Sequence, residues 1–344
     1  MHCPRLDHFV RLNSTGKFGK CGHMTGGQEF NSLNDMQNSQ WLKDLKCQMS
    51  NGQWPSECVR CEMTEKTSNT SIRQDMIERD RILRPIKKDY LIVGGVLDNI
   101  CNSACQSCNA ELSTKIGSLV NKNYKKINNY DNFFQLPQNR IVEVDVNGGE
   151  PTASPNYKKL LKNLPTSVKI VRINTNGSRV ISDIVNLLES GVRVIITLSF
   201  DGTGAVHDYT RWPIKWSSYQ NNVSKYLELR LQYKNLRLNF WTTVSCLNVG
   251  DLHNIIQYAS DKKIDHAYGF CITPTELDVR HNNKLTMKAK EKLSMSENTL
   301  LKSIGATCGS FENNSAVLRM FLQSQDYLRK ISFADYFNFD LNLL

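Results

Sequence analysis

The chain has 344 residues, a formal net charge of +10 and 40% hydrophobic residues. A chain of this length can bury a large core in one domain or two. We find neither an N-terminal apolar signal region nor an apolar stretch long enough to span a bilayer. The sequence therefore predicts a cytoplasmic protein whose eleven cysteines stay reduced, and clustered reduced cysteines tend to bind metal.

The positive charge raises the question of an anionic partner. The basic residues are scattered, with modest clusters at 79–88 and 122–126, and no basic patch is interleaved with aromatic residues. This distribution argues against a nucleic-acid partner. A nucleotide- or RNA-modifying enzyme remains an alternative that a strongly basic site would favour.

Residues 1 to about 70 are rich in Gly, Asn and Ser and contain several cysteines. Little regular periodicity is visible there beyond a helix predicted at 39–49. A charged helix predicted at 72–83 ends before Pro85. We expect a small cysteine-rich module at 1–70 and a helical linker at 71–88.

Residues 89–280 alternate between predicted strands and helices. The predicted strands are 91–97, 141–147, 168–174, 192–200, 236–245 and 267–273, and the helices between them are 110–121, 155–163, 179–190, 217–233 and 250–262. This alternation predicts an α/β fold with a parallel sheet and helices packed outside it. Six such units predict a partial (β/α)6 TIM-like barrel, in which chemistry occurs at the C-terminal ends of the strands.

The remaining residues, 281–344, predict a C-terminal helical extension. Its two helices are expected at 286–303 and 315–330. Val317, Leu318, Phe321, Leu322 and Leu328 predict one apolar face of the second helix. That face suits a helix that caps the open barrel, and binding to a partner is the alternative.

The most informative motif directly follows the strand predicted at 91–97. Cys101, Cys105 and Cys108 have the spacing C-x3-C-x2-C. Three thiolates on one loop can hold three irons of a [4Fe–4S] cluster and leave the fourth iron open to a small molecule. The alternatives are a zinc site with a borrowed fourth ligand, or a disulfide with a spare thiol. No His lies within the next fifty residues to supply the fourth ligand that a structural zinc site needs.

Other short motifs occur where later predicted strands end. They are Gly148-Gly149-Glu150-Pro151, Asn174-Thr175-Asn176-Gly177-Ser178 and Ser199-Phe200-Asp201-Gly202. In this order, after the three cysteines, they resemble the signatures of the radical S-adenosylmethionine (SAM) superfamily. The resemblance departs from the common pattern at Ser107, where many members place an aromatic residue that covers the adenine.

The resemblance implies roles for individual residues. Cys101, Cys105 and Cys108 would be catalytic and would ligate the cluster that binds SAM. The backbone of Gly148, Gly149 and Glu150 would meet the SAM amino group, and Ser178, Ser199 and Asp201 are candidates for ribose and methionine contacts. Arg211 is the candidate partner of the SAM carboxylate, because a guanidinium binds a carboxylate in a planar, bidentate manner. A surface ion pair is the alternative for Arg211.

The resemblance also implies a reaction class. Such an enzyme reductively cleaves SAM to a 5′-deoxyadenosyl radical that abstracts hydrogen from a substrate. We expect an oxidoreductase or a peptide-modifying enzyme acting on a peptide or small molecule, with flavodoxin or ferredoxin as electron donor. A metal-binding scaffold without turnover is the non-enzymatic alternative.

A second group of cysteines lies in the N-terminal module. Cys3, Cys21, Cys58 and Cys61, with Gly16 five positions before Cys21, resemble the SPASM/Twitch auxiliary module. In most relatives that module follows the barrel, so the order here is permuted. The resemblance implies a second, auxiliary [4Fe–4S] cluster whose four thiolates leave no site for SAM. A structural zinc site is the alternative.

The other cysteines are less informative. Cys47 lies on the helix predicted at 39–49 and could compete as a ligand in the N-terminal module. Cys271, at the end of the sixth predicted strand, could face the substrate. Cys246 and Cys308 are isolated, and we expect them to be buried thiols.

Overall fold

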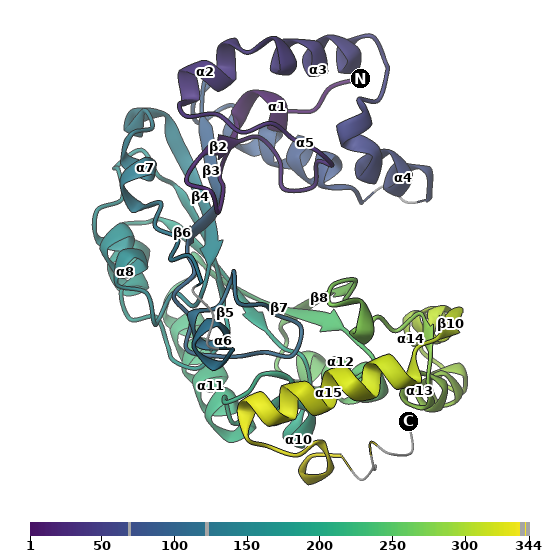
Figure 1. Ribbon diagram of the computed structural model, residues 1–344. Helices are drawn as coiled ribbons and strands as arrows, with labels where there is room; N and C mark the ends of the chain where they lie inside the picture. The colour runs from purple at the N-terminus through teal and green to yellow at the C-terminus, as the bar shows by residue number, and fades with distance from the viewer. Residues whose placement is uncertain (68–69, 121–123, 338–340, 342–344) are drawn as a thin grey trace. The chain divides into compact units, whose positions relative to one another are not determined.

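The computed structural model describes residues 1–67, 70–120, 124–337 and 341 (Figure 1). The chain forms two compact units. The first comprises Met1–Asn99, Lys126–Ile173 and Asp183–Val194, and the second comprises Ile100–Lys125, Asn174–Ser182 and Ile195–Leu344. The domain boundaries expected near residues 70, 88 and 280 stay predictions.

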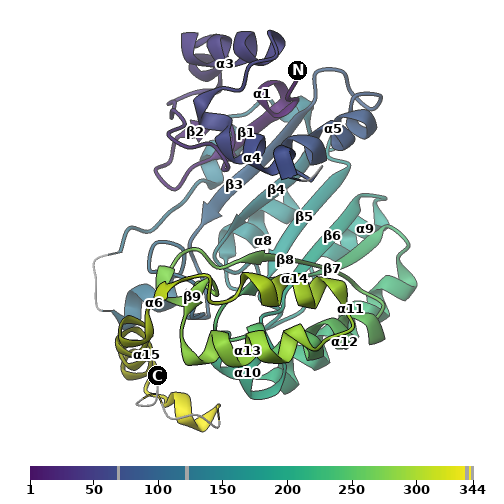
Figure 2. The same ribbon diagram turned by 90° about the vertical axis from the view of Figure 1, so that its right-hand side faces the viewer.

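The first unit contains a sheet whose strand order is β2-β1-β3-β4-β5. These strands are β1 Phe9–Leu12, β2 Phe18–Gly19, β3 Leu91–Asp98, β4 Ile141–Gly148 and the start of β5 Ile170–Thr175. Strands β1, β3, β4 and β5 run parallel to one another, and β2 is antiparallel to β1. Figure 2 shows β3, β4 and β5 side by side. The parallel α/β arrangement predicted for this part of the chain is confirmed.

The first seventy residues contain more regular structure than their periodicity indicates. Besides β1 and β2, this region forms α1 Arg5–His8, α2 Leu33–Asn38, α3 Gln40–Ser50, η1 Ser56–Cys58 and α4 Val59–Thr67. Each of the two strands is too short to show an alternating pattern in the sequence, and they pair antiparallel on either side of Gly16. Helix α3 agrees with the prediction to within a residue at each end.

Two adjacent glycines in β3 make room for β1. A Cβ atom on Gly94 would lie 2.4 Å from the Phe9 ring, and one on Gly95 would lie 2.2 Å from the Leu12 carbonyl oxygen. Gly95 also has a φ of +98°, which other residues rarely adopt. The Gly-Gly pair therefore allows β1 to approach β3 closely.

Four further helices belong to the first unit. They are α5 Ile72–Leu83, α7 Tyr130–Phe134, α8 Pro155–Lys162 and α9 Ile184–Glu189, with the short η2 at Gln138–Arg140. Helix α5 has the predicted bounds, and the Ser71 side chain caps its first turn. Helix α8 begins with a proline after the capping residue Ser154, as is common at helix starts. Helix α9 is shorter than predicted.

A buried charge network joins α5 to the sheet. Glu143, in the middle of β4, is fully buried. Its Oε1 accepts hydrogen bonds from Arg79 Nη1 of α5 at 2.8 Å and from Arg172 Nε of β5 at 2.6 Å. Because burial of an unpaired carboxylate is costly, Arg79 ties α5 to β4, and Arg172 ties β5 to the same carboxylate.

The second unit contains the end of β6 Arg193–Ser199, followed by β7 Leu236–Val244 and β8 Asp265–Phe270. These strands are neighbours in the order β6-β7-β8, and β7 is parallel to β8. Its helices up to this point are α6 Thr114–Leu119, α10 Gly204–Thr210, α11 Trp216–Gln232 and α12 Leu252–Asp261, with η3 at Val249–Asp251. All six strands predicted in the region 89–280 therefore form. Helix α10 was not predicted, and α6 is shorter than expected.

The C-terminal part of the second unit is helical, as predicted, although its first helix divides. It forms η4 Thr275–Leu277, β9 His281–Asn282, α13 Lys284–Ser294, α14 Thr299–Thr307, β10 Phe311–Asn313, α15 Ser315–Arg329 and η5 Phe333–Asp335. Asn298 caps α14, which explains the break in the helix predicted at 286–303. Leu318 and Leu322 of α15, drawn in yellow in Figure 1, are fully buried, whereas Val317 is exposed. The predicted apolar face is thus correct at its centre and wrong at Val317.

Candidate metal centres

The three cysteines of the C-x3-C-x2-C loop lie in the second unit. All eleven cysteines of the chain are free thiols, so these three form no disulfide. The Ser103 hydroxyl lies 3.4 Å from Cys101 Sγ and 3.8 Å from Cys105 Sγ. Two of the three sulfurs therefore converge on one hydroxyl group.

Asn176, from the Asn174–Ser178 motif, holds the cysteine loop. Its Nδ2 donates hydrogen bonds of 2.9 Å to Asn102 Oδ1 and to Ser103 Oγ. Asn102 Nδ2 in turn donates to Ser178 Oγ at 3.0 Å. The predicted site residue Ser178 thus contacts the loop between the first and second cysteines.

The loop backbone is also fixed by other segments of the second unit. The amides of Ala104 and Gln106 donate to the carbonyls of Trp212 and Thr210, at 2.8 and 2.9 Å. Arg329 Nε donates to the Ala104 carbonyl at 2.8 Å, and Arg329 Nη2 donates to the Cys105 carbonyl at 3.3 Å. Sequence reasoning missed Arg329, because a basic residue at the end of a helix usually faces solvent.

Burial controls the charge state of these thiols. It raises the pKa of Cys105, and it raises the pKa of Cys108 to about 12, with further contributions from the neighbouring cysteines. Without a cation both thiols are therefore neutral at pH 7. A metal centre would have to supply the positive charge that makes them thiolates.

Asp201 and Arg211, two predicted site residues, are paired with each other. Arg211 Nη1 lies 2.9 Å from Asp201 Oδ2, and both side chains are buried. Asp201 Oδ1 accepts the Thr243 amide at 2.7 Å, and the Asp201 carbonyl accepts Asn248 Nδ2 at 3.1 Å. The ion pair is therefore part of the interior and not a surface contact.

The charge of Arg211 also interacts with the cysteine loop. Burial alone would lower its pKa, but the negative charges of Cys105 and Asp201 outweigh burial and raise the pKa. Its Nε is buried and has no hydrogen-bond partner among the described residues. One donor of this guanidinium thus remains available beside the cysteines. Ser199, another predicted site residue, lies half-buried at the end of β6.

Gly148, Gly149 and Glu150 lie in the first unit, at the end of β4. Gly148 has a φ of +148°, and a Cβ atom there would lie 2.0 Å from the Asp98 carbonyl oxygen. That same oxygen accepts the Gly149 amide at 2.9 Å. The buried Glu150 carboxylate accepts hydrogen bonds from the amide and the hydroxyl of Thr152 at 3.0 and 2.8 Å. The turn requires glycine because the end of β3 lies against it.

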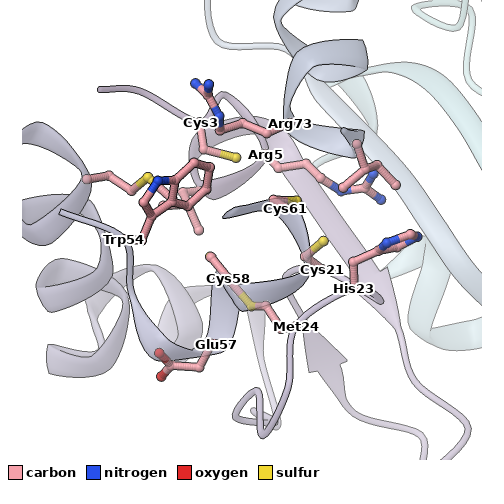
Figure 3. A pocket seen from close by; sticks show the side chains of 13 residues that line it. Cys3, Arg5, Cys21, His23, Met24, Trp54, Glu57, Cys58, Cys61 and Arg73 are labelled. Atoms are coloured by element: carbon pink, nitrogen blue, oxygen red, sulfur yellow. The ribbon is translucent and has the colours of Figure 1, made fainter. Parts of the chain in front are cut away.

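The four N-terminal cysteines line one pocket of the first unit. The empty space of this pocket, counting the part that is open to solvent, is about 360 Å³. Figure 3 shows the sulfurs of Cys3, Cys21, Cys58 and Cys61 facing this common space. They come from separate elements: Cys3 precedes α1, Cys21 follows β2, Cys58 ends η1, and Cys61 lies in the first turn of α4. Tertiary folding therefore brings these four thiols together.

The N-terminal thiols influence one another. Burial raises the pKa of Cys3 to about 11 and that of Cys58 to about 12. The charges of the other three cysteines raise the pKa of Cys58 further. As at the other site, a cation is needed to hold these sulfurs as thiolates at neutral pH.

The remaining cysteines lie apart from these two sites. Cys47 is exposed on α3 and is not part of the pocket lining. Cys246, Cys271 and Cys308 are buried. Cys271 Sγ donates to the Thr273 carbonyl at 3.5 Å. Burial is the main cause that raises the pKa of the Cys271 thiol, and the negative charge of Asp201 adds to it. Cys271 is thus a buried thiol within electrostatic reach of Asp201.

Within the described residues, no group of three or more His, Cys, Asp or Glu side chains is arranged to hold a single metal ion. In the same part of the chain, no helix is long and apolar enough to cross a membrane.

Comparisons with known proteins give limited similarity. No family model and no curated protein matches the chain. SuiB from Streptococcus suis, solved with bound S-adenosylmethionine, is 14% identical over 94% of this chain and 69% of SuiB, with a TM-score of 0.41. SuiB bound to the precursor peptide SuiA gives the same values. The protein anSMEcpe with bound AdoMet is 16% identical over 70% of this chain and 61% of its own, with a TM-score of 0.40. TM-scores this low do not establish a common fold or activity.

Proposed function

We propose that this protein is a radical SAM enzyme with two [4Fe–4S] clusters. The observation that carries the proposal is the cysteine loop of the second unit. Its three thiols are free, and two of them, Cys105 and Cys108, interact electrostatically with the buried Arg211 guanidinium, whose Nε is unpaired among the described residues. Three thiolates suit a cluster with one open iron, and a free N–H donor suits the carboxylate of an amino-acid ligand.

Each residue of the second-unit site has a distinct task. Cys101, Cys105 and Cys108 would hold the cluster, while Asn176 and Arg329 keep their loop in place. When bound and reduced, a cluster of this kind cleaves SAM to methionine and a 5′-deoxyadenosyl radical. Arg211, oriented by Asp201, would donate through Nε to the SAM carboxylate.

The assignments of Ser178, Ser199 and Gly148–Glu150 to SAM remain part of the proposal. Ser178 Oγ accepts the hydrogen bond from Asn102 Nδ2, and its hydroxyl hydrogen can donate a second one. Gly148 and Gly149 offer backbone without side chains at a strand end. Backbone groups of this kind can bind an amino group without competing charge.

The four-thiol pocket of the first unit would hold the auxiliary cluster. Its donor set is all sulfur, which suits an iron–sulfur cluster as well as zinc. With four thiolates and no open iron, this centre would transfer electrons or stabilise residues 1–70. The parallel strands support a partial barrel at 89–280, with residues 1–70 as a permuted Twitch-like module and 281–344 as a helical cap.

The substrate class we propose is a peptide or small molecule, with flavodoxin or ferredoxin as electron donor. The proposal is tested by reconstituting the protein with iron and sulfide without oxygen, adding SAM and dithionite, and measuring 5′-deoxyadenosine. We expect about eight irons per chain and formation of 5′-deoxyadenosine. About four irons together with zinc would contradict the auxiliary cluster alone, whereas absence of 5′-deoxyadenosine would contradict the enzyme.

A further inference from the structure

The four-thiol pocket of the first unit contains a buried cation that no carboxylate balances. Arg5, the first residue of α1, lines the pocket and is only 7% exposed. Its guanidinium lies 3.7 Å from the centre of the Phe9 ring. Among the described residues, Arg5 forms no ion pair, and its buried Nε lacks a hydrogen-bond partner. A buried charge without a partner is strongly unfavourable.

The other charged groups of the pocket are already engaged. Arg73 pairs with Glu65, at 2.9 Å between Nε and Oε1, and donates to the His2 carbonyl at 2.8 Å. The Glu57 carboxylate accepts hydrogen bonds from Trp41 Nε1 at 2.9 Å and from Ser56 Oγ at 3.1 Å. Arg5 is therefore the pocket-lining guanidinium for which a compensating charge is missing.

The four thiols that line the same pocket as Arg5 are groups that can become negative. Figure 3 shows Arg5 among the residues around this space, together with Cys61 and Cys21. Four thiolates outweigh the positive charge of an iron–sulfur core, so a cluster here is anionic and gains one more negative charge on reduction.

We propose that Arg5 is the counter-charge of the N-terminal iron–sulfur cluster and raises its midpoint potential by stabilising the reduced form. This inference rests on the proposed auxiliary cluster. Arg5 acts on the cluster through its charge, at a position that packing on Phe9 fixes. The reduced cluster is stabilised more than the oxidised one because it carries the larger negative charge.

The test measures the potential of this cluster alone. The full chain is prepared with Cys105→Ala, so that the second-unit cluster does not contribute, and is titrated with redox mediators while electron paramagnetic resonance follows the reduced cluster. Arg5→Met is compared with Arg5→Lys, which keeps the charge. Arg60→Met serves as a matched control, because Arg60 adjoins Cys61 in sequence but is exposed, where water screens its charge.

We expect Arg5→Met to shift the midpoint potential to a more negative value, Arg5→Lys to shift it less, and Arg60→Met to leave it close to that of the parent. An unchanged potential in Arg5→Met would overturn the inference. If Arg5→Met fails to retain iron, retention in Arg5→Lys supports a charge requirement, whereas equal loss in both variants overturns it in favour of packing on Phe9.

The iron content of the Cys105→Ala parent separates the two proposals. About four irons establish that the N-terminal cluster exists, so that the potential then tests Arg5 alone. Zinc in place of iron would remove the auxiliary cluster and, with it, the role of Arg5.

Discussion

The two cysteine sites differ in how their sulfurs are gathered and in what surrounds them. The second-unit site takes three thiols from one loop of eight residues, Cys101–Cys108, and secures that loop with side chains from distant segments. The first-unit site takes four thiols from separate elements around a shared pocket. The loop site can therefore be found from spacing alone, whereas the pocket site exists only after the chain has folded.

The guanidinium groups beside the two sites also differ. Arg211 is paired with Asp201 and keeps one free donor, Nε, so it can meet a ligand without being left as an unbalanced charge. Arg5 has no carboxylate partner among the described residues. The paired Arg211 suits a site that binds a zwitterionic ligand, whereas Arg5, which lacks a carboxylate partner, suits a closed anionic centre.

The largest expected effect comes from removing one thiol of the loop. Cys105→Ala should abolish formation of 5′-deoxyadenosine, because a four-iron cluster cannot be held by the two remaining loop thiols. The variant should still retain about four irons in the N-terminal pocket. Cys47→Ala, which removes an exposed thiol outside both sites, is the control and should keep full activity. Retained activity in Cys105→Ala would remove the basis of the ligand assignment.

The converse substitution tests the pocket site. Cys58→Ala should lower the bound iron, by at most about half, because one iron of the proposed pocket cluster then lacks its thiolate ligand. Formation of 5′-deoxyadenosine in the absence of substrate should persist, since the loop site is intact. Iron analysis and product analysis of the same preparation measure both effects, with Cys47→Ala again as control. Unaltered metal content would show that Cys58 is not a ligand.

The glycine turn after β4 should matter to SAM cleavage and not to the pocket site. Gly148→Ala places a Cβ atom 2.0 Å from the Asp98 carbonyl oxygen at a φ of +148°. We expect a destabilisation of about 1–3 kcal/mol and a loss of 5′-deoxyadenosine formation. Thermal unfolding and product analysis measure these effects. Gly250→Ala is the control, because a Cβ there meets nothing within 4 Å. Equal behaviour of the two variants would contradict the assigned role of the turn.

Asn176 tests whether polar contacts from outside the loop hold its thiols in place. Asn176→Ala removes the hydrogen bonds to Asn102 and Ser103 and should cost about 1–3 kcal/mol in the ordering of the loop. The rate of 5′-deoxyadenosine formation should fall by about tenfold. The exposed Asn221 of α11 supplies the control variant, Asn221→Ala. If both variants have the same rate, the loop does not depend on Asn176.

The smallest effect concerns acid stability of the second unit. His207 is fully buried against Tyr219, and burial together with the nearby Arg211 lowers its pKa to about 3 from 6.5. Below pH 6.5 the unfolded chain binds a proton that the folded chain excludes, so stability falls as the pH decreases from about 6.5 towards 3.

The loss of stability at low pH can be tested with a substitution that removes the titrating ring of His207. His207→Phe keeps an aromatic ring but cannot titrate, so it should lose about 1–2 kcal/mol less stability than the parent between pH 7 and pH 5. Urea unfolding at the two pH values measures the difference. His253→Phe, at an exposed position, should behave as the parent does. An identical pH dependence in His207→Phe would show that His207 does not titrate as inferred.

Much of the fold follows from sequence pattern. The six strands of 89–280 and helix α5 form where periodicity predicts them, because long apolar runs and capping residues act locally. Strands β1 and β2 are too short to show a periodic pattern; β1 is stabilised by pairing with β3 across about eighty residues, and β2 by pairing with β1. The break between α13 and α14 was missed because the prediction from periodicity did not take the helix-capping residue Asn298 into account.

The sequence by itself predicted the cysteine loop Cys101–Cys108, because residues on one short segment stay close whatever the rest of the chain does. Only the tertiary structure decided that Asp201 pairs with Arg211, that Arg329 holds the cysteine loop, and that Arg5 lies among four thiols. Those relations depend on which buried charges find partners. Burial and pairing are properties of the folded chain that spacing along the sequence does not contain.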